Sequence, residues 1–180
     1  MILIVDMNFK KHSLAYHEFV LPLVAIVEEF DDFTVKHHLE MGLEVASEYN
    51  KVLLSGNALR NNLFHVRKTG FEWIKQCSKP VLGICAGMQA IGLAFGLQLR
   101  ACQEIGMVNV TTLLSNPLFS SKFRAYALHN CSVDPSEEFA VLAESGLCVQ
   151  AIKHKQKDIF GVLFHPEVRN TEIIKRFLKT

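Results

Sequence analysis

The segment that most constrains the fold of this chain is Pro80-Val81-Leu82-Gly83-Ile84-Cys85-Ala86-Gly87-Met88-Gln89. A short apolar run after a proline predicts a buried strand, and the apolar pattern that continues through Phe95 predicts a helix. Cys85 lies between two glycines at the junction, where a tight strand-to-helix turn requires small neighbours and holds a nucleophile above the sheet. The free N–H groups of the helix N-terminus favour a thiolate there. A buried structural cysteine beside a packing glycine is the alternative interpretation.

The remaining sequence alternates between strand and helix patterns as far as Gly96 and then changes to strand patterns separated by turns. The first part predicts strands at 2–5, 33–36, 51–54 and 81–84. It predicts helices at 14–30, with a break or kink at Pro22, and at 43–49, 64–77 and 88–95. The second part predicts strands at 97–101, 107–114, 123–128, 138–142, 148–152 and 159–164, the last two forming a hairpin, and a helix at 171–178. We therefore expect a single α/β domain over residues 1–180, with a mostly parallel central sheet, helices on both faces and an antiparallel C-terminal half.

Composition excludes several functional classes for this chain of 180 residues. Its formal net charge of +1 provides no basic field for nucleic acid, and no apolar run has the length of a membrane span. The five cysteines are odd in number and scattered, which argues against a disulfide framework or a structural zinc site. The pair His37-His38 is expected to be an exposed loop, because no third ligand lies at metal-binding spacing. We expect no metal or other cofactor, and the cytoplasm as the compartment.

A second informative segment is Ile159-Phe160-Gly161-Val162-Leu163-Phe164-His165-Pro166-Glu167-Val168. An apolar strand ends at His165, and Glu167 follows two positions later. Side chains at the carboxyl ends of strands in open α/β sheets lie where ligands bind, and Cys85 and His165 are both at such ends. A thiol nucleophile requires a base, and a carboxylate that orients the base completes the set. A solvent-facing His-Pro-Glu turn is the alternative for this segment alone.

Taken together, these motifs resemble those of the class I (triad) glutamine amidotransferases. Gly83-Ile84-Cys85-Ala86-Gly87-Met88-Gln89 matches the nucleophile motif of that family, and Phe164-His165-Pro166-Glu167 matches its histidine motif. Leu54-Ser55-Gly56-Asn57 lies where the family has a Ser-Gly-Gly loop, with Asn57 in place of the second glycine. The resemblance implies a flavodoxin-like core, and is greatest to stand-alone amidotransferase subunits of the GMP synthase type.

The resemblance implies hydrolysis of L-glutamine to glutamate and ammonia through a γ-glutamyl thioester on Cys85. His165 would accept the thiol proton and pass it to the leaving ammonia, and Glu167 would orient His165. Backbone N–H groups of Ala86 and of the Gly56-Asn57 loop would bind the oxyanion. Asn57 is the non-glycine residue type that best tolerates a left-handed backbone, which would preserve the loop.

The resemblance also implies substrate contacts and a protein partner. Gln89 would face the polar end of glutamine, and Gly106 and Met107 would offer backbone contacts to its amino-acid end, with an ordinary strand entry as the other interpretation of these two residues. His129 lies in a segment that the related subunits use to contact their synthetase. The expected partner is a separate synthetase that receives the ammonia.

Two other functions remain open at this point. A free-standing γ-glutamyl hydrolase or peptidase would use the same chemistry with a pocket open to larger leaving groups. A non-catalytic regulatory module is the third interpretation, because Asn57 departs from the family pattern of the oxyanion loop.

Overall fold

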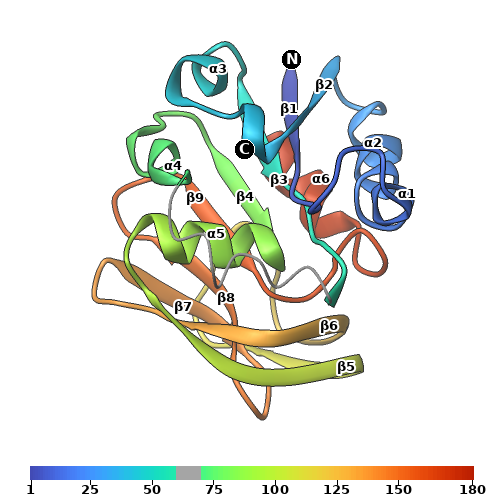
Figure 1. The fold of residues 1–180 in the computed structure, drawn as a ribbon. Helices are drawn as coiled ribbons and strands as arrows, with labels where there is room; N and C mark the ends of the chain where they lie inside the picture. The colour runs from blue at the N-terminus through green and yellow to red at the C-terminus, as the bar shows by residue number, and fades with distance from the viewer. Residues whose placement is uncertain (60–69) are drawn as a thin grey trace.

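One mixed sheet organises the computed structural model, which describes residues 1–59 and 70–180 (Figure 1). Within these residues nine strands follow the order β2-β1-β3-β4-β9-β8-β7-β5-β6. The strands are β1 (Ile2–Asp6), β2 (Phe33–His37), β3 (Lys51–Leu54), β4 (Val81–Ile84), β5 (Gln98–Thr112), β6 (Lys122–Asp134), β7 (Phe139–Glu144), β8 (Val149–His154) and β9 (Ile159–Val162). The first five strands in this order, β2-β1-β3-β4-β9, pair in parallel. The pairs of β9 with β8, β8 with β7, β7 with β5 and β5 with β6 are antiparallel. The expected fold class is therefore confirmed.

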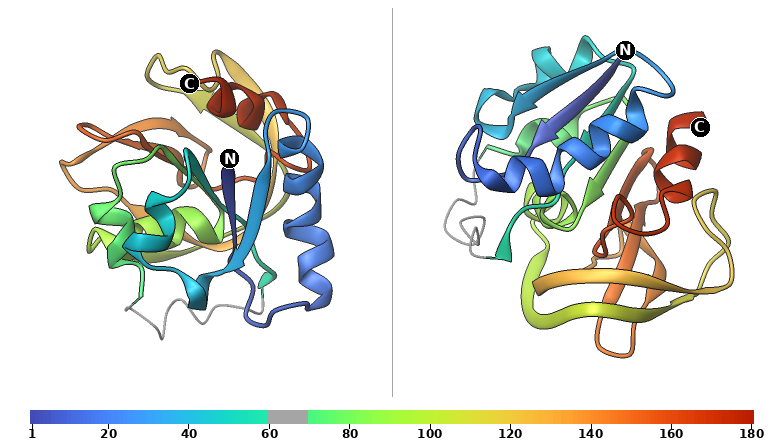
Figure 2. Two further views of the ribbon diagram at one scale, coloured as in Figure 1. Left: turned by 90° about the horizontal axis from the view of Figure 1, so that it is seen from above. Right: turned by 90° about the vertical axis from the view of Figure 1, so that its right-hand side faces the viewer.

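Helices cover both faces of the parallel half of the sheet (Figures 1 and 2). They are α1 (Leu14–Phe19), α2 (Leu21–Val27), α3 (Leu43–Ser47), α4 (Glu72–Gln76), α5 (Ala86–Ala94) and α6 (Glu172–Lys179), with a short 3-10 turn η1 (His38–Glu40). Residues of α3, α4 and α5 pack in one buried apolar cluster, and residues of α2 and α6 pack in a second. Because β1, β3, β4 and β9 contribute to both clusters, they are buried on both faces, which explains their uninterrupted apolar sequences.

The sequence pattern located the central strands well. The expected strands 51–54 and 81–84 coincide with β3 and β4, and the expected hairpin is the antiparallel pair of β8 and β9. The predicted break near Pro22 is also present, because α1 ends at Phe19 and Pro22 lies in the first turn of α2. Proline is tolerated in a first turn because its missing N–H has no partner within the helix there.

Two expectations about elements were wrong. The separate strands expected at 97–101 and 107–114 are one continuous strand, β5, whose pairing with β6 shifts register between Ala101 and Glu104. Of the single helix expected at 64–77, residues 64–69 lie outside the described part of the chain, and the described part forms α4, which begins at Glu72 after Gly70 with φ +106° and ends before Cys77. Phe64, an expected core anchor of that helix, lies outside the described residues. A left-handed glycine does not continue a helix, so the helical pattern is interrupted at Gly70.

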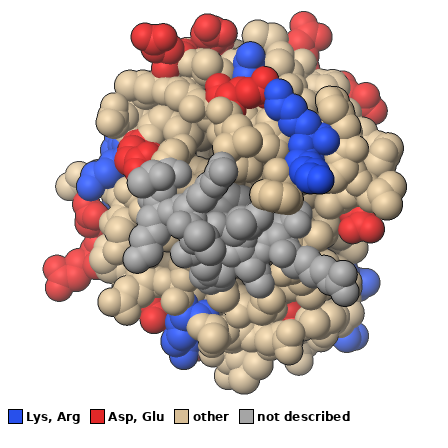
Figure 3. All heavy atoms as spheres, viewed as in Figure 1, with Lys and Arg blue, Asp and Glu red and all other residues tan. Residues whose placement is uncertain are grey.

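On the face seen in Figure 3, the charged side chains of the described residues are of both signs and lie mainly toward the margin. This distribution agrees with the near-zero net charge. No helix among the described residues has the length and apolar sequence needed to cross a bilayer.

Candidate active site

Cys85 occupies a strained turn between β4 and α5. Its backbone has φ +48° and ψ −101°, a conformation that residues other than glycine rarely adopt. Its N–H donates to the carbonyl of Val162 at 2.8 Å, and its carbonyl accepts from the N–H of Gln89 at 3.0 Å as α5 begins. The thiol therefore lies at the N-terminus of α5, as the sequence predicted, with 3% of the residue exposed.

The glycines on either side of Cys85 allow α5 to approach the sheet closely. A Cβ atom on Gly83 would lie 2.5 Å from the backbone of Gly87, and one on Gly87 would lie 2.5 Å from the carbonyl oxygen of Leu54. Gly161 on β9 has the same role, because a Cβ atom there would lie 2.7 Å from the Met88 side chain. A larger residue at Gly83 or Gly87 would require the backbone to move, so both glycines are a packing requirement of the turn.

The strain at Cys85 is measurable without any activity. We expect Cys85→Gly to be more stable than Cys85→Ala by about 1 kcal/mol in urea unfolding, because glycine adopts positive φ without the steric cost that a Cβ brings. Both variants lack the thiol, so the comparison isolates the backbone. Equal stability of the two, or a more stable alanine variant, would show that the turn relaxes without cost.

His165 and Glu167 form a buried pair next to this turn. His165 follows β9, the parallel neighbour of β4, so it lies at the same edge of the sheet as Cys85. The imidazole Nδ1 is 2.7 Å from Glu167 Oε1, and neither side chain is exposed. The backbone N–H of His165 donates to the carbonyl of Tyr126 on β6 at 2.8 Å. This hydrogen bond fixes the backbone position from which the imidazole side chain extends. Cys85 and His165 thus follow neighbouring parallel strands at the carboxyl edge of the sheet.

The electrostatics of this pair favour a protonated imidazole. Burial alone would lower the pKa of His165, but the Glu167 carboxylate, followed by the Cys85 thiol, outweighs burial and raises that pKa well above its ordinary value. Nε2 of His165 and Oε2 of Glu167 are buried and have no hydrogen-bond partner among the described residues. A buried ring nitrogen that has no hydrogen bond within the protein can exchange a proton with a nearby thiol or with a bound substrate.

The Gly56-Asn57 loop after β3 packs directly on this histidine. A Cβ atom on Gly56 would lie 2.5 Å from His165 Cε1, so only glycine fits. The side chain of Asn57 donates to the carbonyl of Met7 at 3.4 Å and ties the loop to the segment after β1. The described non-glycine residues with positive φ do not include Asn57, so this position does not need the left-handed backbone that its residue type would tolerate.

Strand β6 forms the other side of the site, and no sequence signal marks its role. The Cys85 thiol donates to the carbonyl of Leu128 at 3.5 Å, and the Gln89 amide donates to the carbonyl of Cys131 at 3.1 Å. These acceptors are backbone atoms, so no residue type distinguishes them in the sequence. Gln89 is only 8% exposed, and its amide nitrogen is directed at β6.

The predicted substrate contacts Gly106 and Met107 lie on β5, opposite Ala127 and Tyr126 of β6. Gly106 has φ +102° and Met107 is 38% exposed. Tyr126 connects these residues to His165 through its carbonyl group. They are thus one strand removed from the histidine, and their contact with a substrate remains a prediction.

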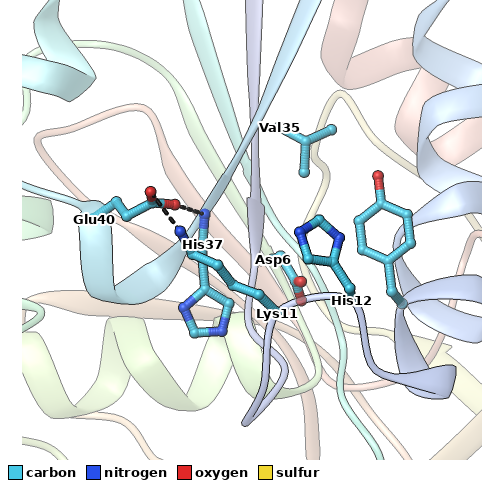
Figure 4. Close-up of a pocket in the computed structure, with 7 residues that line it drawn as sticks. Asp6, Lys11, His12, Val35, His37 and Glu40 are labelled. Carbon is cyan, nitrogen blue, oxygen red and sulfur yellow. Dashed lines mark hydrogen bonds and ion pairs between the residues drawn. The ribbon is translucent and has the colours of Figure 1, made fainter.

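A cavity of about 310 Å³ opens beyond the ends of β1 and β2 (Figure 4). It is lined by Asp6, Lys11, His12, Tyr16, Val35, His37 and Glu40. Glu40 accepts from the backbone N–H of His37 and pairs with Lys11 at 2.6 Å. The expectation of an exposed histidine pair was wrong for His37, which is 4% exposed because its Nε2 is hydrogen-bonded to the carbonyl of Asn8 at 2.8 Å. None of the residues Cys85, His165 and Glu167 lines this cavity.

The arrangement at the end of β4 and β9 has a definite chemical capability. It presents a thiol at a helix N-terminus, an imidazole beside it, and a carboxylate on the far nitrogen of that imidazole. This is the arrangement in which a nucleophile is activated by a general base and the base is held in one tautomer. No residue of this set requires a metal or a cofactor for that chemistry.

Comparison with known proteins identifies related sequences. The family model described as glutamine amidotransferase class-I matches residues 14–180. The chain is 44% identical over 111 residues to the glutamine-hydrolyzing GMP synthase subunit of Methanocaldococcus jannaschii, and 42% identical over 111 residues to the protein of the same name from Methanococcus maripaludis strain S2. Each alignment covers 56% of this chain and 59% of the relative. The match thus spans little more than half the length of these curated relatives.

Solved structures share the fold over nearly the whole chain. A putative GMP synthase subunit from Thermoplasma acidophilum superposes with a TM-score of 0.81 at 24% identity, covering 99% of this chain and 93% of that one. A glutamine amidotransferase from Thermotoga maritima superposes with a TM-score of 0.70 at 21% identity, covering 99% and 81%. At these identities the likeness establishes the fold alone.

Proposed function

The chain belongs to the class I glutamine amidotransferase family, and from this premise we propose that it hydrolyses L-glutamine to glutamate and ammonia and passes the ammonia to a separate synthetase. The observation that carries the proposal is the buried His165–Glu167 pair, 2.7 Å apart, beside a cysteine held in a strained turn. Strained backbone at a nucleophile persists only where the surrounding packing enforces it, which is typical of reactive sites.

In the proposed reaction, Sγ of Cys85 attacks the γ-carbonyl carbon of glutamine while His165 holds the thiol proton on Nε2. Collapse of the tetrahedral intermediate breaks the C–N bond, and the proton goes from Nε2 to the departing ammonia. A water molecule then attacks the thioester, with Nε2 accepting its proton, and returns glutamate and the free thiol. Glu167 keeps Nδ1 protonated and stabilises the imidazolium throughout.

The oxyanion of each tetrahedral intermediate requires hydrogen-bond donors that are already in position. We assign this role to the backbone N–H of Ala86, at the start of α5, and to the Gly56-Asn57 loop, which packs on His165. One such donor is worth about 3–4 kcal/mol in comparable acyl transfer. The Asn57 side chain is directed at Met7, so it supports the loop from behind.

The partner is inferred from the chemistry and from the relatives. Ammonia released into water at neutral pH becomes ammonium, which is not a nucleophile, so delivery to a docked acceptor enzyme conserves it. Both relatives bear the name of a glutamine-hydrolyzing GMP synthase subunit, which favours a separate synthetase of the GMP synthase type in the acceptor role. Ile105 and Met107 of β5 flank Gly106 in the sequence, and their exposed side chains are available to such a partner.

The test of the proposed function is release of ammonia from L-glutamine by the purified chain, alone and with a synthetase of the GMP synthase type. We expect glutamate and ammonia in equal amounts, with faster release when the synthetase is present. Turnover of γ-glutamyl peptides well above that of glutamine, without a partner, would instead favour a free-standing γ-glutamyl hydrolase. No turnover of either substrate with the synthetase bound would support the non-catalytic module.

The contact between Gly56 and His165 leads to a prediction about rate. In Gly56→Ala the new methyl group must displace the imidazole, because the undisturbed distance to Cε1 is 2.5 Å. We expect kcat/KM for glutamine to fall by about 100-fold, the scale of a 1 Å misplacement in a site of this kind. Gly42→Ala is the matched control, since a Cβ atom there meets nothing within 4 Å. Similar activity in both variants would contradict the proposed position of His165 in the reaction.

A further inference from the structure

A second cluster of reactive side chains lies behind the candidate active site, where β5, β6 and the turn before β8 meet. We propose that Cys102, Cys148, Glu104 and His129 form a binding site for a divalent transition-metal cation, with Zn²⁺ as the best match to the donor set. Two thiolates, one imidazole and one carboxylate are ligands that zinc accepts in tetrahedral sites. The proposal is independent of glutamine hydrolysis and of the residues that carry it.

The cluster is compact and largely removed from solvent. Ligand atoms of Cys102, Glu104 and Cys148 all lie within 4.8 Å of one another. Cys148 is 6% exposed, Glu104 is 7% exposed and His129 is 1% exposed, whereas Cys102 is half-buried. Cys102 is thus the member of the cluster most accessible to a reagent in solution.

Two separations within the cluster, both measured to Oε2 of Glu104, are close to the edges of a zinc tetrahedron. Zinc–sulfur bonds of ~2.3 Å and zinc–nitrogen or zinc–oxygen bonds of ~2.1 Å imply edges of about 3.6 Å for sulfur to oxygen and about 3.4 Å for nitrogen to oxygen. Sγ of Cys148 lies 3.4 Å from Oε2 of Glu104, and Nε2 of His129 lies 3.3 Å from the same oxygen. Each of these two distances differs from the corresponding tetrahedral edge by about 0.2 Å or less.

His129 provides the observation that points to a ligand. Its Nδ1 lies 3.0 Å from the carbonyl oxygen of Cys102, which only accepts, so the Nδ1 proton is donated there. In the neutral ring this leaves a lone pair on Nε2. Nε2 is buried and faces Glu104 Oε2 at 3.3 Å without a hydrogen bond among the described residues. A cation bound between these two atoms would give Nε2 the partner that it lacks.

The surroundings hold these ligands as a metal site requires. Ligating histidines usually donate their other nitrogen to a carbonyl, which is the role of the Cys102 carbonyl here. Glu104 Oε2 accepts from Gln150 Nε2 at 2.6 Å and from the Ser145 hydroxyl at 3.0 Å, so the carboxylate is fixed from behind. On binding, Zn²⁺ displaces the protons of both thiols, which leave to solvent.

The ligands are not visible as a motif because they come together through the fold. Cys102 lies within the register shift of β5, and Glu104, where pairing resumes, is opposite His129 of β6. Cys148 lies in the turn before β8. His129 lies in a segment that related subunits use to contact their synthetase, but its own side chain is completely buried. The carbonyl of the preceding residue, Leu128, accepts a hydrogen bond from the Cys85 thiol. A metal bound at this cluster would therefore stabilise the segment of β6 that contacts Cys85.

The test uses the full chain, reduced and stripped with a chelator, then titrated with Co²⁺ in the absence of oxygen. We expect a thiolate-to-cobalt charge-transfer band and the intense visible bands of tetrahedral Co²⁺, saturating at one equivalent and abolished by Zn²⁺. Cys148→Ser should weaken binding by about 100-fold or more. Cys77→Ser, a buried cysteine outside the cluster, is the matched control and should leave the bands unchanged.

A measurement on the unaltered chain keeps the test independent of how the variants fold. Zn²⁺ should slow alkylation of Cys102 by iodoacetamide at least tenfold, as read by peptide mass spectrometry, while the rate at Cys77 stays the same. The proposal is overturned if the reduced chain shows no cobalt bands, or if Zn²⁺ leaves the reactivity of Cys102 unchanged. It is equally overturned if the bands survive Cys148→Ser and disappear only in Cys85→Ser.

Discussion

Replacing Cys85 with alanine is expected to reduce glutamine hydrolysis by at least about 10⁴-fold, because no other group in the site forms the thioester. The substitution removes Sγ and its hydrogen bond to the Leu128 carbonyl, and it should leave α5 and the proposed oxyanion donors in place. In the complex with a synthetase, product formation supported by added ammonium salts should remain. The measurement is product formation with glutamine or with ammonium as nitrogen source.

The matched control for this variant is Cys77→Ala, which removes a buried thiol from the end of α4. It should retain activity with both nitrogen sources. Loss of glutamine-dependent and ammonia-dependent product together in Cys85→Ala would contradict the assignment, because it would indicate a damaged complex. Retention of both would show that Cys85 is not the nucleophile.

Replacing Glu167 with glutamine is expected to lower kcat for glutamine by about 10³–10⁴-fold, the scale observed when the carboxylate of a triad is neutralised. The variant keeps the shape of the side chain but removes the charge 2.7 Å from His165 Nδ1. The histidine then loses its fixed tautomer and the partner that stabilises its imidazolium. Steady-state rates for this variant, with exposed Glu137→Gln as control, provide the measurement.

The same variant has a pH signature in stability. The Glu167 carboxylate helps to raise the pKa of His165 above its unfolded value, so the pair stabilises the folded chain below the unfolded pKa of about 6.5. This contribution is lost as pH rises through the folded pKa of His165. The difference in unfolding free energy between the native chain and Glu167→Gln should therefore be largest near pH 6 and shrink at alkaline pH. A difference that grows with pH would contradict the charged pair.

The parts of the molecule that sequence reasoning located are those in which local chemistry dictates local structure. Gly83, Cys85 and Gly87 are recognisable because a tight turn under a helix tolerates only small neighbours, and the close approaches at both glycines bear this out. The strand β4 before them has an unbroken apolar sequence because it is buried on both faces. His165 and Glu167 are two positions apart, so their pairing follows from one short segment.

The parts that sequence reasoning missed depend on contacts between distant segments. Strand β5 is continuous because β6 pairs along it on both sides of the register shift, although Gly106 and polar residues interrupt its apolar pattern. His37 can be buried because its ring Nε2 is hydrogen-bonded to the backbone carbonyl of Asn8, in the segment after β1. The carbonyls of Leu128 and Tyr126 that position Cys85 and His165 belong to the backbone and leave no trace in residue identity.

The proposed metal cluster illustrates the same limit. Scattered spacing argued against a zinc site, since motifs with short spacing are the ones that sequence displays. Cys102 and Cys148 are distant in sequence and meet only after the antiparallel half of the sheet has formed. Spacing along the sequence is therefore a weak guide to ligands that come from two strands, β5 and β6, and from the turn before β8.

The proposed reaction depends above all on Cys85 being the nucleophile in a site that binds the side-chain amide of glutamine. The most direct measurement is mass-spectrometric mapping of the chain, with its synthetase present, after reaction with a diazoketone analogue of glutamine. We expect one adduct per chain, on Cys85, that glutamine prevents and that Glu167→Gln forms slowly. An adduct on any other of the five cysteines, or no adduct while a general alkylating reagent still modifies Cys85, would contradict this role.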